Sequence, residues 1–503
     1  MANYSAVAGS MRKAFLTGKT KSLEWRRSQL LALLKMLDEN RDRLTDALMK
    51  DLNKCRFESC LMEVDFVRND LINALNNLSD WAKPEKVKKG LINIMDKVYI
   101  RKEPFGVALI MGAWNYPVQL TVAPMIGALA AGNCVLMKPS EVSENVASLL
   151  DELFPKYFDT DCIKCVCGGI PETTALLKEK WDYIFYTGNS FVGKIVMKAA
   201  AEHLTPVTLE LGGKSPVYVD QGCDLGIVAN RILWGKVTNA GQTCVAPDYI
   251  MCTKETQDVL VEKMKATLGE FYPEGPAKSP YYCRLITDRH YQRVKKMING
   301  GGKLALGGES DDSQRFIAPT VLSDVTFSDP IMQEEVFGPV LPIVPVKNED
   351  EAIAHINEGG TGTPLALYVF SNNQQLIQKI LDSVNSGGFC ANDILMQGSL
   401  PTLPFGGVGN SGMGCYHGKF SFDTFSHKRA CMERGLKMES VNSMRYPPCT
   451  SQKEKTAAWL LKKKLKSNGP MSYVPYFIFG TLFAVFLKIF FAPESSIYNI
   501  FSK

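Results

Sequence analysis

The sequence is poor in the residues from which histidine-based metal centres are built. It contains five histidines in 503 residues, and none of them lies in a pair spaced as metal ligands. Cys162, Cys165 and Cys167 lie close together, but no second Cys/His pair is placed to complete a zinc site with them. We therefore expect no metal ion, and we expect these three cysteines to lie on a strand.

Two further absences bear on where the protein works. The first 20 residues contain no apolar core of the length that a secretory signal needs. The 14 cysteines lack the regular spacing of a disulfide framework. We therefore expect reduced thiols and a catalytic part in the cytosol.

The net charge of +5 is unevenly distributed. Residues 451–470 contain six lysines and one glutamate, and residues 471–503 contain two lysines and one glutamate. The preceding 450 residues therefore have a net charge close to −1. A body this near to neutrality is not typical of a nucleic-acid-binding protein, so we expect no nucleic-acid partner.

The C-terminal region contains one long apolar stretch, Tyr473–Ala492, whose single charge is Lys488. About 20 mainly apolar residues match the hydrocarbon thickness of a bilayer. Tyr473 and Tyr476 lie at the end where interfacial aromatic residues are expected, directly after the lysine-rich run. This pattern predicts a transmembrane helix at 471–492. A buried core helix and a helix lying in the membrane plane are the alternatives.

Short apolar runs alternate with helical patterns along the body of the chain. This alternation predicts parallel βαβ units and an α/β fold with two doubly wound, Rossmann-like domains. A preceding stretch, Glu24–Leu52, has apolar residues at helical spacing and predicts one amphipathic surface helix. The predicted strands are Leu109–Gly112, Val135–Lys138, Tyr183–Thr187, Pro216–Val219, Ile250–Cys252, Pro342–Val346 and Leu367–Phe370, with helices at Val118–Ala131 and Phe191–Glu202.

Three short motifs contain residues that could act in catalysis. Cys244 follows a glycine-containing turn in AGQTCVAP, where a thiol can be presented to a cleft. Glu210 precedes two glycines in LELGGKS and could act as a general base. Asn115 in GAWNYP could donate its amide to an oxyanion. Taken singly, each residue also fits a structural role: a buried small thiol, a solvated carboxylate and a turn asparagine.

Taken together, the motifs resemble the aldehyde dehydrogenase superfamily over about residues 5–445. Within that superfamily, the short N-terminal region before WNYP is similar to the class 3 branch. The apolar C-terminal segment resembles the membrane-anchored fatty aldehyde dehydrogenases of that branch. The matching strings, in order, are WNYP at 114–117, KPSE at 138–141, YTGNSFVG at 186–193, LELGGKSP at 209–216, NAGQTCVAP at 239–247, QEEVFGPVLP at 333–342 and PFGGVGNSGMG at 404–414.

The resemblance implies catalytic roles for the three motif residues. Cys244 would attack an aldehyde carbonyl, and the oxyanion of the thiohemiacetal would be held by Asn115 and the backbone N–H of Cys244. Loss of hydride would leave a thioester. Glu210 would then activate the water that hydrolyses it.

The resemblance also implies a set of cofactor-binding residues. No G-x-G-x-x-G motif occurs in the expected place, but Gly188 and Gly193 follow a predicted strand and precede a helix. A carboxylate beside the adenosine ribose would accept from a 2′-OH and repel a 2′-phosphate, which favours NAD, with NADP possible. The implied set is Lys138 and Glu141 at that ribose, Gly188, Gly193 and Leu211 along the dinucleotide, and Glu335 and Phe337 at the nicotinamide end.

The resemblance further predicts the domain organisation and the partners. We expect an NAD-binding domain at 1–83 and 103–209, a catalytic domain at 210–398 and a small β oligomerisation arm at 84–102 and 399–430. A basic linker at 431–470 would lead to the anchor at 471–492. Class 3 relatives imply a homodimer, and the anchor implies contact with a lipid membrane, which we expect to be that of the endoplasmic reticulum.

The leading functional hypothesis is NAD-dependent oxidation of long-chain aliphatic aldehydes to fatty acids. One alternative is oxidation of medium-chain or aromatic aldehydes, and another is CoA-acylating dehydrogenation, against which Glu210 argues. A third alternative is a non-catalytic membrane-anchored protein that keeps the fold. The intact trio of Asn115, Glu210 and Cys244 favours an enzyme over the last alternative.

Overall fold

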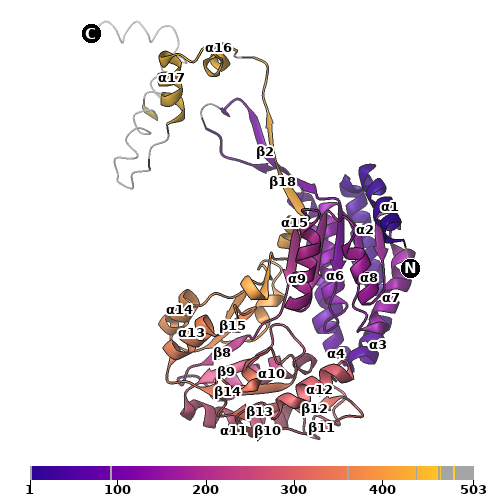
Figure 1. The fold of residues 1–503 in the computed structure, drawn as a ribbon, viewed down its shortest axis with the longest axis vertical. Helices are drawn as coiled ribbons and strands as arrows, with labels where there is room; N and C mark the ends of the chain where they lie inside the picture. Colours follow the sequence, from indigo (N-terminus) through magenta and orange to yellow (C-terminus); the bar gives the residue numbers. More distant parts are fainter. Residues whose placement is uncertain are drawn as a thin grey trace, which may run out of the picture. The chain divides into compact units, whose positions relative to one another are not determined.

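A computed structural model describes residues 3–90, 93–359, 362–437 and 439–462, together with Leu465, Gly480 and Thr481. These residues divide into two compact units. The larger unit is formed by Met1–Glu85 and Ile100–Ala430, and the smaller by Lys86–Tyr99 and Cys431–Lys503. The larger unit contains two separate sheets with helices around them (Figure 1).

The first sheet has six strands in the order β17-β7-β6-β3-β4-β5. The chain builds outward from β3 to β4 and β5 on one side, then returns to place β6 and β7 on the other, with all five parallel. This is a doubly wound order, and it puts the carboxyl ends of β3 and β6 at the switch point. The strands are β3 (Val107–Met111), β4 (Cys134–Lys138), β5 (Ile163–Cys165), β6 (Tyr183–Thr187), β7 (Val207–Glu210) and the antiparallel β17 (Gly412–Met413).

The second sheet has seven strands in the order β10-β13-β14-β9-β8-β15-β16 and repeats the doubly wound pattern around β8. Its edge strand β10 is antiparallel to β13. The strands are β8 (Pro216–Val219), β9 (Tyr249–Cys252), β10 (Lys303–Leu306), β13 (Thr320–Ser323), β14 (Val340–Pro345), β15 (Ala366–Phe370) and β16 (Gly388–Ala391).

Helices cover both sheets. Those beside the first sheet are α6 (Gln119–Ala131), α7 (Glu144–Tyr157), α8 (Ile170–Leu177) and α9 (Ser190–Ala201), and those beside the second are α10 (Leu225–Val237), α11 (Lys254–Phe271), α12 (Asp288–Met297), α13 (Glu349–Glu358) and α14 (Gln374–Ser383). The shorter elements are β11 (Ser310–Asp311), β12 (Phe316–Ile317), η1 (Lys19–Lys21), η4 (Thr238–Gly241), η5 (Pro330–Met332), η6 (Met396–Ser399) and η7 (Gly409–Ser411).

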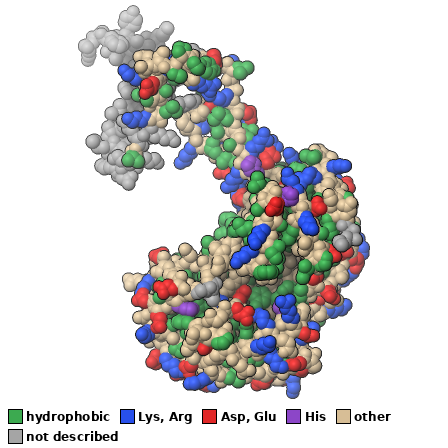
Figure 2. Space-filling model, viewed as in Figure 1, with side chains coloured by type: hydrophobic (Ala, Val, Ile, Leu, Met, Phe, Trp, Pro, Cys, Tyr) green, Lys and Arg blue, Asp and Glu red, His purple; other side chains and the backbone are tan. Residues whose placement is uncertain are grey.

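The prediction of an α/β fold with two Rossmann-like sheets is confirmed. Every residue of β3, β4, β6 and β8 is buried, which explains why these strands read as continuous apolar runs rather than alternating ones. Lys, Arg, Asp and Glu side chains are interspersed over the visible face of the larger unit (Figure 2), in keeping with its near-neutral charge.

The predicted single helix over Glu24–Leu52 is wrong. The structure has two helices there, α2 (Leu23–Glu39) and α3 (Arg41–Leu52), which meet at Asn40. The side chain of Asn40 donates to the Met36 carbonyl at 2.9 Å and to the Tyr157 hydroxyl at 2.9 Å. That tertiary contact stabilises the break, since a buried amide needs its partners. The neighbouring elements are α1 (Tyr4–Leu16), α4 (Arg56–Ser59), the π-helix η2 (Cys60–Val64) and α5 (Asp65–Trp81).

The segments predicted to form the oligomerisation arm contribute strands to more than one sheet. β1 (Glu85–Lys86), β2 (Lys97–Pro104) and β18 (Ser426–Glu433) form a three-stranded sheet in that order. The segment 399–430 also supplies β17 to the first sheet, and its helix α15 (Lys419–Thr424) packs against α6.

The smaller unit contains α16 (Glu439–Asn442), η8 (Ser443–Arg445) and α17 (Ser451–Leu461). Within it, Lys97 forms an ion pair with Glu433 at 2.9 Å. The predicted transmembrane helix at 471–492 lies outside the described residues, apart from Gly480 and Thr481. Among the described helices, none has the length and apolar character required to span a bilayer.

A buried ion pair joins the N-terminal helices to the first sheet. Lys54 and Glu63 are completely buried, with Nζ and Oε1 2.6 Å apart. The second carboxylate oxygen of Glu63 accepts the backbone N–H groups of Val118, at 2.8 Å, and Gln119, at 3.3 Å, at the start of α6. Lys54 also donates to the Asn115 carbonyl at 3.1 Å. The loop after β3 is therefore held by two opposite charges that have no access to water.

We expect Lys54→Met to lower the free energy of unfolding by about 3–5 kcal/mol, because Glu63 would be left buried without its counter-ion. Denaturant unfolding of both proteins would measure the difference. Lys156→Met is the matched control, since Lys156 pairs with Glu152 on the surface and its loss should cost under about 1 kcal/mol. Equal costs for the two substitutions would contradict this account of the buried pair.

Candidate active site

Cys244 follows a backbone segment of unusual conformation. Asn239, Ala240 and Gly241 have successive φ values of 52°, 50° and 72°, all in the left-handed region. A Cβ atom at Gly241 would lie 2.3 Å from the Gly338 carbonyl oxygen, so this position has no room for a side chain. Two successive non-glycine residues in this region cost on the order of 1–2 kcal/mol each. The surrounding structure must therefore hold the segment in place.

Buried hydrogen bonds hold the segment Asn239–Gly241 in place. The backbone N–H of Asn239 donates to Glu58 Oε1 at 2.8 Å. The Gln242 side chain donates to the Asn239 carbonyl at 3.0 Å and accepts from the backbone N–H of Ile286 at 3.0 Å. Each of these polar groups is satisfied inside the protein, so the residues just before Cys244 have little freedom to move.

Asn115 reaches this segment from the loop after β3. Its side chain is 3 % exposed, and Nδ2 donates to the Gln242 carbonyl at 3.0 Å. Its own carbonyl accepts from Asn239 Nδ2 at 2.8 Å. An amide nitrogen has two hydrogens, so one can anchor the side chain while the other is donated to an oxyanion.

Glu210 is the last residue of β7 and is 3 % exposed. Neither carboxyl oxygen has a hydrogen-bond partner among the described residues. Burial therefore raises the pKa of Glu210 well above its usual range. Burial, followed by the nearby carboxyls of Glu335 and Glu210, also raises the pKa of Cys244 to about 12. The structure thus brings the predicted nucleophile close to the predicted base and to a second carboxyl.

Comparison with known proteins bears directly on this arrangement. A family description, "Aldehyde dehydrogenase family", matches residues 2–431. The chain belongs to the aldehyde dehydrogenase family.

Two relatives show that it is of the class 3 kind. The chain is 52% identical over 458 residues to aldehyde dehydrogenase family 3 member A2 of Pongo abelii, covering 91% of this chain and 94% of the relative. It is 53% identical over 448 residues to the mouse (Mus musculus) "Aldehyde dehydrogenase, dimeric NADP-preferring", covering 89% of this chain and 98% of the relative. The structure titled "Substrate bound state of Staphylococcus Aureus AldH" has a TM-score of 0.88 and 41% identity, over 91% of this chain and 100% of that one.

Aldehyde dehydrogenases use NAD or NADP, so the residues expected to hold a dinucleotide can be tested against the fold. The backbone N–H of Gly188 donates to the Glu210 carbonyl at 3.0 Å. A Cβ atom at Gly188 would lie 2.2 Å from the Tyr186 hydroxyl, and one at Gly193 would lie 2.8 Å from Leu211. Both glycines therefore allow close packing where β6 leads into α9. Asn189 caps that helix, and the N–H groups of its first turn can bind a pyrophosphate.

Lys138 and Glu141 lie at the carboxyl end of β4, the strand next to the switch point. Lys138 is buried, and its ammonium donates to Glu141 at 3.0 Å and to the Pro139 carbonyl at 3.2 Å. The pair places one positive and one negative group at the edge where a doubly wound sheet binds its ligand.

Glu335 and Phe337 lie on the loop before β14, and the carboxyl of Glu335 is close enough to Cys244 to raise the pKa of its thiol. A Cβ atom at Gly212 would lie 2.2 Å from Glu335 Oε2, so the carboxyl lies against the glycine pair that follows Glu210. Burial, followed by the charge of Asp248, raises the pKa of Glu335 to about 8. Phe337 has a left-handed φ of 44°, and its ring lies edge-on to Trp114 with centroids 5.4 Å apart.

These observations fit a dinucleotide. The structure provides a glycine-lined helix start, a basic and an acidic residue at the switch point, and an unpartnered buried carboxyl beside the thiol. The residues expected to take part are Lys138, Glu141, Gly188, Gly193, Leu211, Glu335 and Phe337 for the cofactor and Asn115, Glu210 and Cys244 for the chemistry, and these roles stay predictions.

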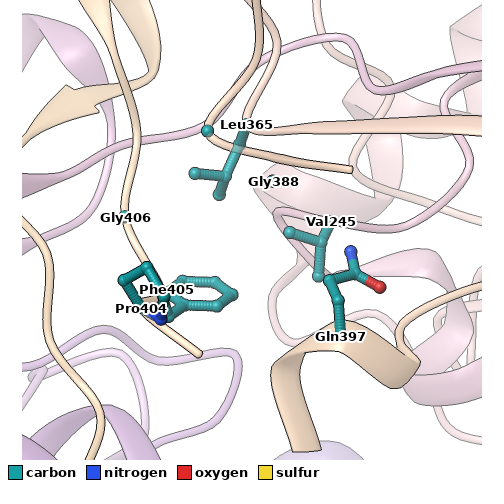
Figure 3. A pocket seen from close by; sticks show the side chains of 8 residues that line it. Val245, Leu365, Gly388, Gln397, Pro404, Phe405 and Gly406 are labelled. Atoms are coloured by element: carbon teal, nitrogen blue, oxygen red, sulfur yellow. The ribbon is translucent and has the colours of Figure 1, made fainter. Parts of the chain in front are cut away.

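A small cavity lies beside the Cys244 loop. Its volume is about 20 Å³, which is enough for one water molecule or one methyl group. Figure 3 shows Leu365 pointing into the space between Phe405 on one side and Val245 and Gln397 on the other. Gln397 Nε2 donates at 3.2 Å to the Tyr368 hydroxyl, which itself donates at 2.7 Å to the Val245 carbonyl. These two hydrogen bonds connect Gln397 in the cavity wall to Val245, the residue after Cys244.

Sequence reasoning missed the residues that support the site. Lys54, Glu58 and Glu63 lie in the N-terminal helical region, where charged residues ordinarily face solvent. No spacing in the sequence shows that they contact segments 55 to 181 residues away. Gln242 lies in the motif AGQTCVAP, and its position two residues before Cys244 is the one feature of the sequence that indicates a role near the thiol.

The raised pKa values predict how activity depends on pH. Oxidation needs the thiolate of Cys244 and the carboxylate of Glu210. Burial raises the pKa of Cys244 to about 12 and raises the pKa of Glu210 well above its usual range. Their deprotonated fractions grow as pH rises, so kcat/KM should increase by up to about tenfold per pH unit between about pH 7 and 9. Steady-state assays over that range would measure the slope.

Glu210→Gln removes the proton acceptor and leaves the Cys244 thiol to titrate, so its pH profile should lie lower than that of the wild type and should still rise. The exposed Glu262→Gln is the matched control and should leave the wild-type profile unchanged. A wild-type profile that is flat or falling above pH 7 would contradict the assignment.

Proposed function

We propose that this class 3 aldehyde dehydrogenase oxidises long-chain aliphatic aldehydes to fatty acids with NAD, through a covalent intermediate on Cys244. The observation that carries the chemistry is the buried, unpartnered carboxyl of Glu210 beside a thiol whose loop is held rigidly. A buried carboxyl without a partner is costly in a fold, and a catalytic role as a base accounts for it.

The residues suggest the following sequence of events. The Cys244 thiol transfers its proton to Glu210, directly or through water, and the thiolate forms a bond to the aldehyde carbon. The oxygen becomes an oxyanion, which accepts from the free amide hydrogen of Asn115 and from the backbone N–H of Cys244. Loss of hydride from the same carbon converts the thiohemiacetal into a thioester. Glu210 first releases to solvent the proton that it took from the thiol. Its carboxylate then takes a proton from water, whose oxygen attacks the thioester carbon. The C–S bond breaks to give the acid and a thiolate, which takes up the proton from Glu210.

The dinucleotide, when bound, supplies the hydride acceptor at its nicotinamide ring. The Glu141 carboxylate would accept from a ribose 2′-OH and would repel a 2′-phosphate, which supports NAD over NADP. The relative named NADP-preferring shows that sequence similarity does not decide this choice. The carboxyl of Glu335 and the ring of Phe337 would bind the nicotinamide end.

The preference for long chains rests on the C-terminal residues. An apolar stretch after a lysine-rich run supports attachment to a membrane, where long-chain aldehydes accumulate. We propose an anchor at 471–492, a basic linker at 431–470 and a cytosolic catalytic part, with the endoplasmic reticulum as the membrane.

The same proposal assigns roles to the parts of the body. Residues 1–83 and 103–209 would bind the cofactor, 210–398 would carry Cys244, and 84–102 with 399–430 would form the oligomerisation arm. The name "dimeric" of the mouse relative supports a homodimer.

Oxidation of medium-chain or aromatic aldehydes is the second candidate function. It stays open because the chain is about as similar to the mouse dimeric relative, at 53% identity, as to member A2 of Pongo abelii, at 52%. The two functions predict different dependences on chain length. Each further methylene that the enzyme or the membrane buries contributes about 0.8 kcal/mol, or roughly fourfold in kcat/KM.

The deciding experiment measures NADH formation with hexanal, decanal, hexadecanal and benzaldehyde in the presence of phospholipid vesicles. We expect kcat/KM to rise from hexanal to decanal and to stay high for hexadecanal. Cys244→Ala should lose activity about 1,000-fold or more on every substrate. Deletion of residues 468–503 should release the protein from vesicles and lower only the long-chain rates.

Each outcome separates one part of the proposal from the others. A flat profile, or a preference for benzaldehyde, would favour the second candidate. Full activity of Cys244→Ala would remove the assigned nucleophile. Vesicle binding that persists after the deletion would contradict the anchor, and a product that forms only with CoA would contradict hydrolysis by Glu210.

A further inference from the structure

A cluster of sulfur and oxygen atoms lies at the edge of the first sheet, away from Cys244. It comprises Cys165, the last residue of β5, Cys167 two residues later, and Asp151 on α7. The two sulfur atoms and a carboxylate oxygen all lie within 4.8 Å of one another. The two cysteines are two residues apart at the end of a strand, which puts their side chains on the same face.

The edge position leaves this cluster open to solvent. β5 is the last strand of its sheet, and Asp151 and Cys167 are exposed while Cys165 is half-buried. Cys167 Sγ donates to the Ala147 carbonyl at 3.4 Å, one helical turn before Asp151 on α7. The thiols are therefore held against the helix that carries the carboxylate, and a small ion can reach all three groups.

The two sulfur ligands and one oxygen ligand favour a zinc-like cation. Two sulfurs and one oxygen suit Zn²⁺, whereas Mg²⁺ and Ca²⁺ prefer oxygen ligands alone. In a tetrahedral zinc site with Zn–S bonds of about 2.3 Å, neighbouring ligand atoms are separated by about 3.8 Å. The present separations need to shrink by about 1 Å at most, which rotation of the exposed Cys167 and Asp151 side chains provides. Water would fill the fourth position.

The cluster is also next to the expected cofactor edge. Cys165 pairs with Met137 in the parallel register of β5 and β4, so Lys138 is the next residue along the neighbouring strand. Lys138 is the residue that donates to Glu141.

We propose that Asp151, Cys165 and Cys167 bind one Zn²⁺ ion at this edge of the first sheet. Both thiols release a proton to solvent as the two Zn–S bonds form, and no electrons are transferred. The net charge of the cluster stays at −1, because the two positive charges of the ion replace the two protons. Metal binding does not depend on the proposed function.

Sequence spacing alone indicated no metal here, because no second Cys/His pair follows the cysteines. The third ligand is a carboxylate from a helix that precedes them in the chain. The pair Cys134 and Cys162 in the same region is fully buried and includes no such carboxylate in the cluster, so we do not assign it a metal.

Binding is tested with Cd²⁺ as a spectroscopic substitute, since each Cd–thiolate bond adds ultraviolet charge-transfer absorption. The full-length protein carries Cys244→Ser, which removes the active-site thiol from the titration. We expect saturation at one equivalent, with competition by Zn²⁺ and none by Mg²⁺. Cys165→Ser or Cys167→Ser should abolish the signal, and Asp151→Asn should weaken binding about tenfold. Cys449→Ser, which removes an exposed cysteine elsewhere, is the matched control.

An unchanged Cd²⁺ signal in both cysteine variants would overturn the site. Competition by Mg²⁺ as strong as that by Zn²⁺ would overturn the choice of metal, because two sulfur ligands favour Zn²⁺. The titration does not require enzyme activity, so a failure of the proposed function would leave the binding result standing.

Discussion

The hydrogen bond from Asn115 Nδ2 to the Gln242 carbonyl connects the two halves of the larger unit at the point where chemistry is expected. Asn115 follows β3 of the first sheet, and Gln242 precedes β9 of the second. The bond orients the amide that would hold an oxyanion and fixes the backbone two residues before Cys244. Lys54 and Glu63 support it from one side, and Glu58 supports it from the other through Asn239. The left-handed segment Asn239–Gly241, which is unfavourable by itself, is thus held in one conformation and fixes the position of the Cys244 thiol.

Burial sets the electrostatics around that thiol. Glu210 is buried and Glu335 is half-buried, and burial raises the pKa values of both carboxyls. A protonated carboxyl has no charge and can lie near the Cys244 thiolate without repelling it, whereas the carboxylate form is the one that accepts a proton. Glu210 has no hydrogen-bond partner among the described residues, and the well-packed strands around it offset the cost of its burial.

The sequence predicted the strands better than it predicted the buried polar residues that hold the active-site loops. Tyr183–Thr187 and Pro216–Val219 have the bounds that were predicted, because strands buried on both faces read as short apolar runs. The motif residues Asn115, Glu210 and Cys244 also come together as the resemblance implied, although their roles stay predictions. The break at Asn40, the ion pair of Lys54 with Glu63 and the approach of Asp151 to the cysteines could not be predicted. Each depends on a tertiary contact that leaves no periodic signal, and charged residues in helices usually face water.

The central claim is that Cys244 forms a bond to the substrate which Glu210 then helps to break. Mass spectrometry of Glu210→Gln, quenched after mixing with decanal and NAD, tests both halves at once. The account predicts an acyl group on the peptide that contains Cys244, present in high yield in this variant and in low yield in the wild-type protein. An acyl group on another cysteine, or a Glu210→Gln protein that turns over normally without any adduct, would contradict it.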